Sequence, residues 1–137
     1  MVFPEQILET VEVTAKSQAR WLTDDSAMRS ASLLAGLHPD SAALALVMLA
    51  LKLNTPFAVV PCCVFPNSIE QLKAVNVRTH HDFVNYIESL DTRIRREFLP
   101  FAGRNTVLFM RPDDPPIPRA PSQDPTQPGA FGRKWTD

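Results

Sequence analysis

Apolar residues along the chain fall into short runs that proline and polar residues separate. The run Phe57–Val60 stands between Pro56 and Pro61 and is rich in β-branched side chains. It predicts a strand buried on both faces that ends where Pro61 removes a ladder donor. The run Ala31–Leu37 predicts a second short buried strand, and Gly36 near its end permits a close approach of the backbone.

Between these two runs, residues 43–53 are almost wholly apolar. They predict a mostly buried helix, with Asp40 or Ser41 as its N-cap. After the second strand, residues 64–68 predict a turn, and residues 68–74 predict a short helix. The chain therefore alternates strand and helix, which is typical of an α/β domain.

Two further helical and strand patterns follow. Thr79 is a good cap for a helix whose apolar residues recur at helical spacing up to Leu90. Residues 95–101 and 106–110 alternate as strands do, with a turn around Gly103. They predict an antiparallel hairpin at the end of the sheet.

The first thirty residues have a weaker pattern. Residues 4–22 favour a helix that begins after Pro4, although the β-branched alternation of residues 11–14 is equally typical of a short strand. Residues 23–26 are polar and of the helix-capping type. We expect a break there, immediately before the next element.

The whole pattern predicts an α/β fold built as a truncated Rossmann-like half-sheet. Parallel strands are extended by a C-terminal antiparallel hairpin, with helices on the faces of the sheet. Three regions result: an N-terminal helical or irregular segment (1–30), an α/β core (31–111) and a proline-rich tail (112–137). The tail holds seven of the thirteen prolines. We expect it to be extended or disordered unless a partner holds it, with Phe131–Trp135 as an aromatic and basic anchor.

Composition narrows the class of protein without naming a partner. The 137 residues have a formal charge of −1 and are 45% hydrophobic, which is typical of one ordinary globular domain. No stretch approaches the roughly twenty apolar residues that a membrane helix needs. The adjacent cysteines Cys62 and Cys63 are poorly placed to bridge, so we expect free thiols and an intracellular reducing compartment, cytoplasmic or mitochondrial.

The candidate chemistry lies where the predicted strands end. Ligands of open α/β sheets bind beyond the carboxyl ends of the strands. Pro61, Cys62 and Cys63 follow one strand, and His38 and Asp40 follow the other. A rim histidine and thiols can orient a substrate or transfer a proton, whereas the alternative is a loop histidine that binds backbone and two small packing residues.

The sequence gives weaker evidence for a metal site or a nucleic-acid site than for chemistry at the strand ends. Cys62 and Cys63 with His38, His80 and His81 offer soft ligands, but adjacent side chains diverge from an extended backbone, so we expect no metal site. The two histidines at positions 80 and 81 are predicted to be solvated. The basic residues Arg93, Arg95 and Arg96 have acidic neighbours, which favours a solvated helix end over an RNA phosphate site.

Three segments together carry a resemblance: residues 33–40 with the following apolar helix, residues 56–66, and residues 99–105. They resemble the C-terminal half of a class I S-adenosylmethionine-dependent methyltransferase. Within that superfamily the chain is most similar to the branch with a Leu-His element near the fourth strand and a Pro-Cys-Cys element after the fifth, here Leu37-His38 and Pro61-Cys62-Cys63. This branch includes RNA-modifying enzymes. The resemblance covers about residues 32–110.

The resemblance implies a pocket whose rim carries the candidate catalytic residues His38, Asp40, Cys62 and Cys63. Its candidate cofactor-binding residues are Gly36, His38 and Pro61. Such enzymes bind the cofactor mainly through a glycine-rich loop after the first strand and an acidic residue after the second. With only four glycines in the chain, no such loop can be written. The half that binds the cofactor is missing, so no cofactor is expected for this chain alone.

Three hypotheses about function follow. The first is a catalytically silent methyltransferase-like protein, a structural or accessory subunit whose open sheet edge and tail (112–137) are covered by other protein subunits of a larger, RNA-containing or organellar assembly. The second is an active S-adenosylmethionine-dependent, RNA-directed methyltransferase, as a fragment or as half of a split enzyme. The third is a small redox or metal-binding module that uses Cys62 and Cys63.

Overall fold

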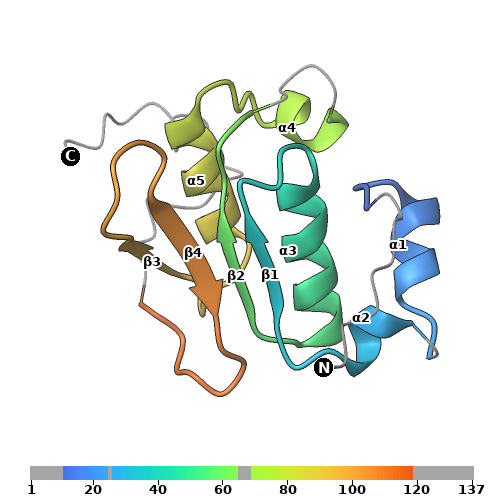
Figure 1. The fold of residues 1–137 in the computed structure, drawn as a ribbon. Coiled ribbons are helices and arrows are strands. Elements are labelled where there is room, and N and C mark those ends of the chain that lie inside the picture. Colours follow the sequence, from blue (N-terminus) through green and yellow to red (C-terminus); the bar gives the residue numbers. More distant parts are fainter. Residues whose placement is uncertain (1–10, 25, 65–68, 119–137) are drawn as a thin grey trace, which may run out of the picture.

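The computed structural model describes residues 11–24, 26–64 and 69–118. These residues form one four-stranded sheet and five helices, drawn in Figure 1. In chain order the elements are α1 (Ala15–Trp21), α2 (Ala27–Ser30), β1 (Leu34–Leu37), α3 (Ala42–Leu53), β2 (Phe57–Val60), α4 (Glu70–Ala74), α5 (His80–Ser89), β3 (Arg95–Phe98) and β4 (Thr106–Met110).

The sheet has the strand order β1-β2-β4-β3. Strands β1 and β2 are parallel, with Leu34 opposite Phe57, whereas β4 is antiparallel to both β2 and β3. The α/β class, the parallel pair and the terminal antiparallel hairpin are thus confirmed. This mixed sheet is compatible with half of a Rossmann-like fold. The second strand of the hairpin, β4, lies between β2 and β3.

Helices α3 and α5 cover the same face of the sheet. Residues that are opposite each other on neighbouring strands point to one face, and the row Gly36, Val59, Leu108 and Arg96 is such a set. A Cβ on Gly36 would lie 3.2 Å from Leu46 of α3, and Arg96 bonds to two side chains of α5. The connection from β1 through α3 to β2 and the connection from β2 through α5 to β3 run in the same direction across the sheet. Because such connections between parallel strands are right-handed, both helices lie on one side of the sheet. Helices on more than one face were expected.

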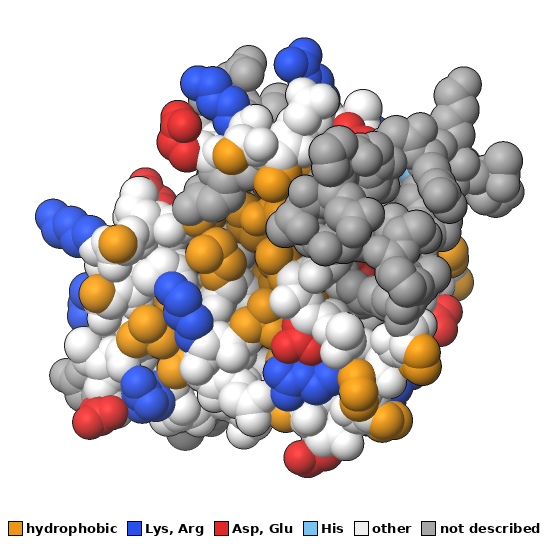
Figure 2. Space-filling view, turned by 180° about the vertical axis from the view of Figure 1, so that it is seen from behind, with side chains coloured by type: hydrophobic (Ala, Val, Ile, Leu, Met, Phe, Trp, Pro, Cys, Tyr) orange, Lys and Arg blue, Asp and Glu red, His pale blue; other side chains and the backbone are white. Residues whose placement is uncertain are grey.

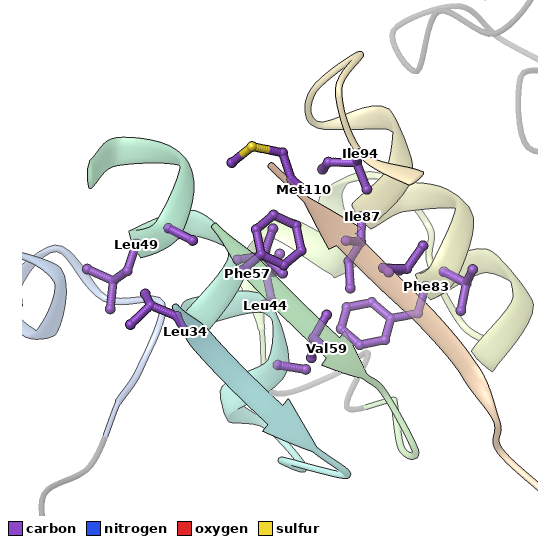
Figure 3. Packing of buried hydrophobic residues seen from close by; sticks show 14 of the residues in the cluster. Leu34, Leu44, Leu49, Phe57, Val59, Phe83, Ile87, Ile94 and Met110 are labelled. Carbon is purple, nitrogen blue, oxygen red and sulfur yellow. The ribbon is translucent and has the colours of Figure 1, made fainter. Parts of the chain in front are cut away.

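The hydrophobic core fills the layer between the sheet and these two helices. In Figure 3, Phe57, Val59 and Met110 of the strands point toward Leu44 of α3 and Ile87 of α5. All five are at most 1% exposed. Six residues of α3 are buried, which confirms the predicted buried helix, and the left-handed Asn54 ends it.

The N-terminal segment packs beside α3 at the β1 side of the molecule (Figure 1). Thr14 caps α1 by accepting a hydrogen bond from the Ser17 amide, so the helix prediction is confirmed from residue 15 and the alternative strand over residues 11–14 is wrong. Ser26 caps α2, as predicted. The buried amide of Gln18 donates to the Ala45 carbonyl of α3, which fixes α1 against the core.

Several predicted boundaries shift. Strand β1 begins at Leu34 rather than at residue 31. Ala31 is instead the C-cap of α2, and its amide donates a hydrogen bond to the Met28 carbonyl. Strand β3 ends at Phe98, two residues before Pro100, and α4 begins at Glu70. The predicted α5 is confirmed, with a capping box between Thr79 and Asp82. The predictions for residues 1–10, 25, 65–68 and 119–137 lie outside the described residues.

The beginning of the tail packs on the domain itself. The Ile117 amide donates to the Thr92 carbonyl at 2.7 Å, and the Arg95 side chain binds both the Asp114 carboxylate and the Pro115 carbonyl. Residues 112–118 contain no helix or strand, as expected. Their position needs no partner, however, because these contacts already hold them. Among the helices that the structure describes, none has the length and apolar character required to span a membrane.

Candidate functional site

The carboxyl ends of β1 and β2 bring three predicted site residues together. The Cys62 thiol lies 3.4 Å from Oδ1 of Asp40 and donates a hydrogen bond to it. One ligand atom each from Asp40, Cys62 and Cys63 lies within 4.8 Å of the others. Both cysteines are free, Cys62 is half-buried, and Cys63 and Asp40 are exposed. We call these three residues the Cys-Cys-Asp cluster.

The backbone after β1 turns Asp40 toward β2. His38 and Asp40 both have φ of 49°, in the left-handed region that histidine and aspartate tolerate better than most residues. The His38 amide donates to the Val60 carbonyl at 2.9 Å, which ties the exits of the two strands together. The predicted side-chain cap of α3 is absent: Ser41 occupies the N-cap position but makes no capping bond with its side chain. The Asp40 carboxylate binds Cys62 instead.

The His38 ring is directed away from this cluster. Its Nε2–H donates to the Arg104 carbonyl at 3.0 Å, and its ring meets Phe101 edge-on with 6.3 Å between centroids. Both partners belong to the loop between β3 and β4. The structure therefore gives His38 the contacts of a loop histidine that binds backbone, and its side chain does not join Asp40 and the thiols.

His80 holds the other side of the site, a role that the sequence did not indicate. Its Nε2–H donates to the Pro61 carbonyl at 2.9 Å, so the prediction of a solvated side chain at this position is wrong. Burial lowers the pKa of His80, and the nearby Arg104 reinforces this, so that the ring is neutral near pH 7. The contact spans nineteen residues of sequence, and no local pattern announces it. It fixes the turn that carries Cys62 and Cys63.

The two thiols differ in their surroundings. Burial and the neighbouring Cys63 thiol raise the pKa of Cys62 above its ordinary value, outweighing the opposite effect of the Asp40 backbone. Cys62 is therefore a protonated donor to Asp40 at neutral pH rather than a thiolate nucleophile.

Gly36 and Pro61 are used by the fold. A Cβ on Gly36 would lie 3.0 Å from Cγ of Pro39 and 3.2 Å from Leu46, so the glycine permits α3 to approach β1. Pro61 is buried, and its carbonyl accepts from His80. Both positions thus have packing or support roles in the fold.

The three arginines near the start of β3 bind acidic groups of the same chain. Arg93 pairs with Asp91, Arg95 with Asp114, and Arg96 with Glu88 at 2.6 Å. Figure 2 shows charged side chains of both signs interspersed around a central group of hydrophobic ones. The arginines therefore order the chain around β3, and the predicted solvated helix end is wrong.

Comparison of this chain with family models, with curated proteins and with solved structures finds no match.

Proposed function

We propose that this chain is a catalytically silent, methyltransferase-like half-domain that works as a structural or accessory subunit of a larger protein assembly. The observation that carries the proposal is the open β1 side of the sheet. Leu37 in β1 is 68% exposed, and Leu33 immediately before it is 54% exposed. Strands of parallel pairs are ordinarily buried on both faces, so this apolar strand lacks its cover.

The backbone of β1 offers an edge for pairing. The amides of Leu34 and His38 donate to the carbonyls of Pro56 and Val60 of the β2 segment. Because successive amides of a strand point to opposite sides, those of Ala35 and Leu37 point away from β2. Among the described strands, β1 has a neighbour on this one side alone. A strand of a partner can therefore extend the sheet here.

The two edges of the sheet differ in the way expected for one solvent edge and one interface edge. Edge strands in isolated proteins carry charges or prolines that prevent pairing with other chains. β3 has three charged residues among four, Arg95, Arg96 and Glu97. Residues 31–37, by contrast, contain neither a charge nor a proline. The charged residues of β3 and their lack at residues 31–37 favour β1 as the edge that a partner covers.

The face of the sheet opposite α3 and α5 continues this open surface along β1. Leu34 and Phe57 point toward the helices, so their neighbours Ala35, Leu37 and Ala58 point to the opposite face. Ala35 and Leu37 are exposed and Ala58 is half-buried, whereas Val60, opposite Leu37, is buried. The partner that pairs with β1 is therefore expected to cover the adjoining part of this face as well.

A second candidate function is an active S-adenosylmethionine-dependent, RNA-directed methyltransferase whose other half is supplied by another polypeptide. The convergence of Asp40, Cys62 and Cys63 beyond the strand ends favours it, since ligands of open α/β sheets bind at this edge. The packing role of Gly36 and the direction of the His38 ring favour the silent subunit.

The native size of the endogenous protein distinguishes the two. In a gentle extract, sedimentation with mass spectrometry of the co-migrating proteins should show stoichiometric association with a large complex. A monomeric species would contradict the subunit proposal. Association with a single polypeptide that carries a glycine-rich cofactor loop, together with S-adenosylmethionine binding by the pair, would favour the split enzyme. A flat titration of S-adenosylmethionine against that pair would refute it.

A further inference from the structure

We infer that Asp40, Cys62 and Cys63, the Cys-Cys-Asp cluster, form a binding site for a thiophilic divalent cation of the zinc class. Two thiolates, formed when the ion displaces the thiol protons into solvent, and a carboxylate are ligands that Zn²⁺ and its heavier relative Cd²⁺ accept together. The sequence argument against a metal site assumed an extended backbone through both cysteines. Strand β2 ends at Val60, however, and beyond it both thiols lie near the same carboxylate.

The separation of Cys62 and Asp40 is close to the spacing of two ligands at a tetrahedral ion. With bonds of roughly 2.3 Å to sulfur and 2.1 Å to oxygen, tetrahedral geometry separates a sulfur and an oxygen ligand by about 3.6 Å and two sulfurs by about 3.8 Å. The Cys62 Sγ to Asp40 Oδ1 distance is 3.4 Å. All three ligand atoms lie within 4.8 Å of one another. Closing the widest of these separations by about 1 Å would bring the three ligand atoms to tetrahedral spacing.

The surrounding structure positions these ligands before an ion arrives. His80 fixes the carbonyl of Pro61, the residue before the two cysteines, and the His38 amide joins the exits of β1 and β2. The backbone that carries the ligands is therefore held in place before an ion binds. The two histidines serve as supports, because the Nε2 atom of each already bonds to a backbone carbonyl.

Three protein ligands leave one tetrahedral position to solvent or to a ligand from outside the chain. Such an open position distinguishes reactive or transfer sites of zinc from closed structural ones. The exposure of Asp40 and Cys63 gives the ion a path from solution. The site would thus bind exchangeable metal at the surface. This inference is independent of the proposed subunit function.

Titration of the reduced full-length chain with Cd²⁺, without oxygen, tests the site. We expect one equivalent per chain, with an ultraviolet thiolate-to-metal charge-transfer band, and a tetrahedral visible spectrum with Co²⁺. A chain with both Cys62→Ser and Cys63→Ser should lose the band. Asp40→Asn, which is nearly isosteric, should weaken binding by about tenfold or more, since loss of supporting groups alone typically costs that much.

Asp113→Asn is the matched control, because Asp113 is an exposed carboxylate outside the cluster. It should bind Cd²⁺ as the unchanged chain does, and circular dichroism should show that all variants are folded. Equal affinity of the Asp40→Asn variant and the unchanged chain would overturn the three-ligand site. Two chains per ion, bridged through exposed thiols, would overturn it too. Neither result would alter the native size on which the proposed function depends.

Discussion

Truncating the two exposed leucines at the β1 edge should separate association from folding. The double substitution Leu33→Ala and Leu37→Ala removes apolar surface that a partner at β1 would bury. The two side chains are 54% and 68% exposed in the single chain. The substitution should therefore weaken the complex while the domain stays folded.

The expected magnitude follows from these exposures. Leucine to alanine removes three carbons, and burial of each contributes about 0.8 kcal/mol. Complete burial by a partner of the exposed 68% of Leu37 and 54% of Leu33 makes the losses about 1.6 and 1.3 kcal/mol. Together they amount to about 3 kcal/mol, or about 100-fold in the dissociation constant. The free energy of unfolding should change by less than about 0.5 kcal/mol.

The assay is dilution of the isolated complex followed by sedimentation, which gives the concentration at which half of the chain dissociates. Phe98→Ala is the matched control, because Phe98 is 67% exposed but lies on β3, at the opposite edge of the sheet. Equal dissociation of the control and the double variant would refute the assignment of the partner to β1. So would an unchanged midpoint for the double variant.

Three further predictions concern the scaffold. Leu44 is fully buried, so Leu44→Ala should lower the free energy of unfolding in urea by about 2 to 5 kcal/mol, and a loss below about 1 kcal/mol would contradict its central position. Gly36→Val forces side-chain carbons against Leu46, 3.2 Å from where a Cβ would lie, and should cost about 1 to 3 kcal/mol; a stabilised variant would contradict this packing. Burial alone would raise the pKa of Asp82, but hydrogen bonds from the Thr79 and Arg78 amides outweigh it and lower the pKa. The stability from this carboxylate is thus present above the ordinary aspartate pKa and lost as the pH falls through the lower folded value. Asp82→Asn should flatten the pH dependence of unfolding in that acidic range, and an unchanged slope would refute the capping role.

Several elements of the fold were predictable from residues at or next to their own ends. Prolines on both sides fixed β2 at Phe57–Val60 as predicted, and Thr79 marked the first turn of α5. Gly103, with φ of 94°, turns the chain between the two hairpin strands. In each case the residue restricts its own backbone or satisfies a neighbouring amide, so the sequence pattern is sufficient.

Contacts between distant residues were not predictable in the same way. The Ala31 amide closes α2 and thereby shortens β1, although the apolar run begins at residue 31. The His80 to Pro61 bond depends on how α5 packs beside β2, which a histidine at a helix start does not reveal. The position of β4 between β2 and β3 likewise depends on the pairing of the whole sheet.

The candidate site was predictable as a location but not as an arrangement. Ligands of open α/β sheets bind at the carboxyl ends of the strands, and this rule indicated where to look for a site. Asp40, Cys62 and Cys63 do lie together at that edge. The rule could not indicate that His38 turns toward Arg104, because that choice depends on the loop between β3 and β4. It also did not indicate that α3 begins without a side-chain cap. The Asp40 carboxylate instead accepts a hydrogen bond from the Cys62 thiol.

A partner at the β1 edge is tested most directly by a photo-crosslinking amino acid at position 37 of the endogenous chain, compared with the same group at position 98. The two positions are almost equally exposed and lie on opposite edge strands. A partner at β1 should give a stoichiometric crosslink from position 37 to one protein, at a strand or an apolar surface of that protein, and little crosslinking from position 98. Crosslinking of position 37 only within its own chain, or equal labelling from both positions, would contradict it.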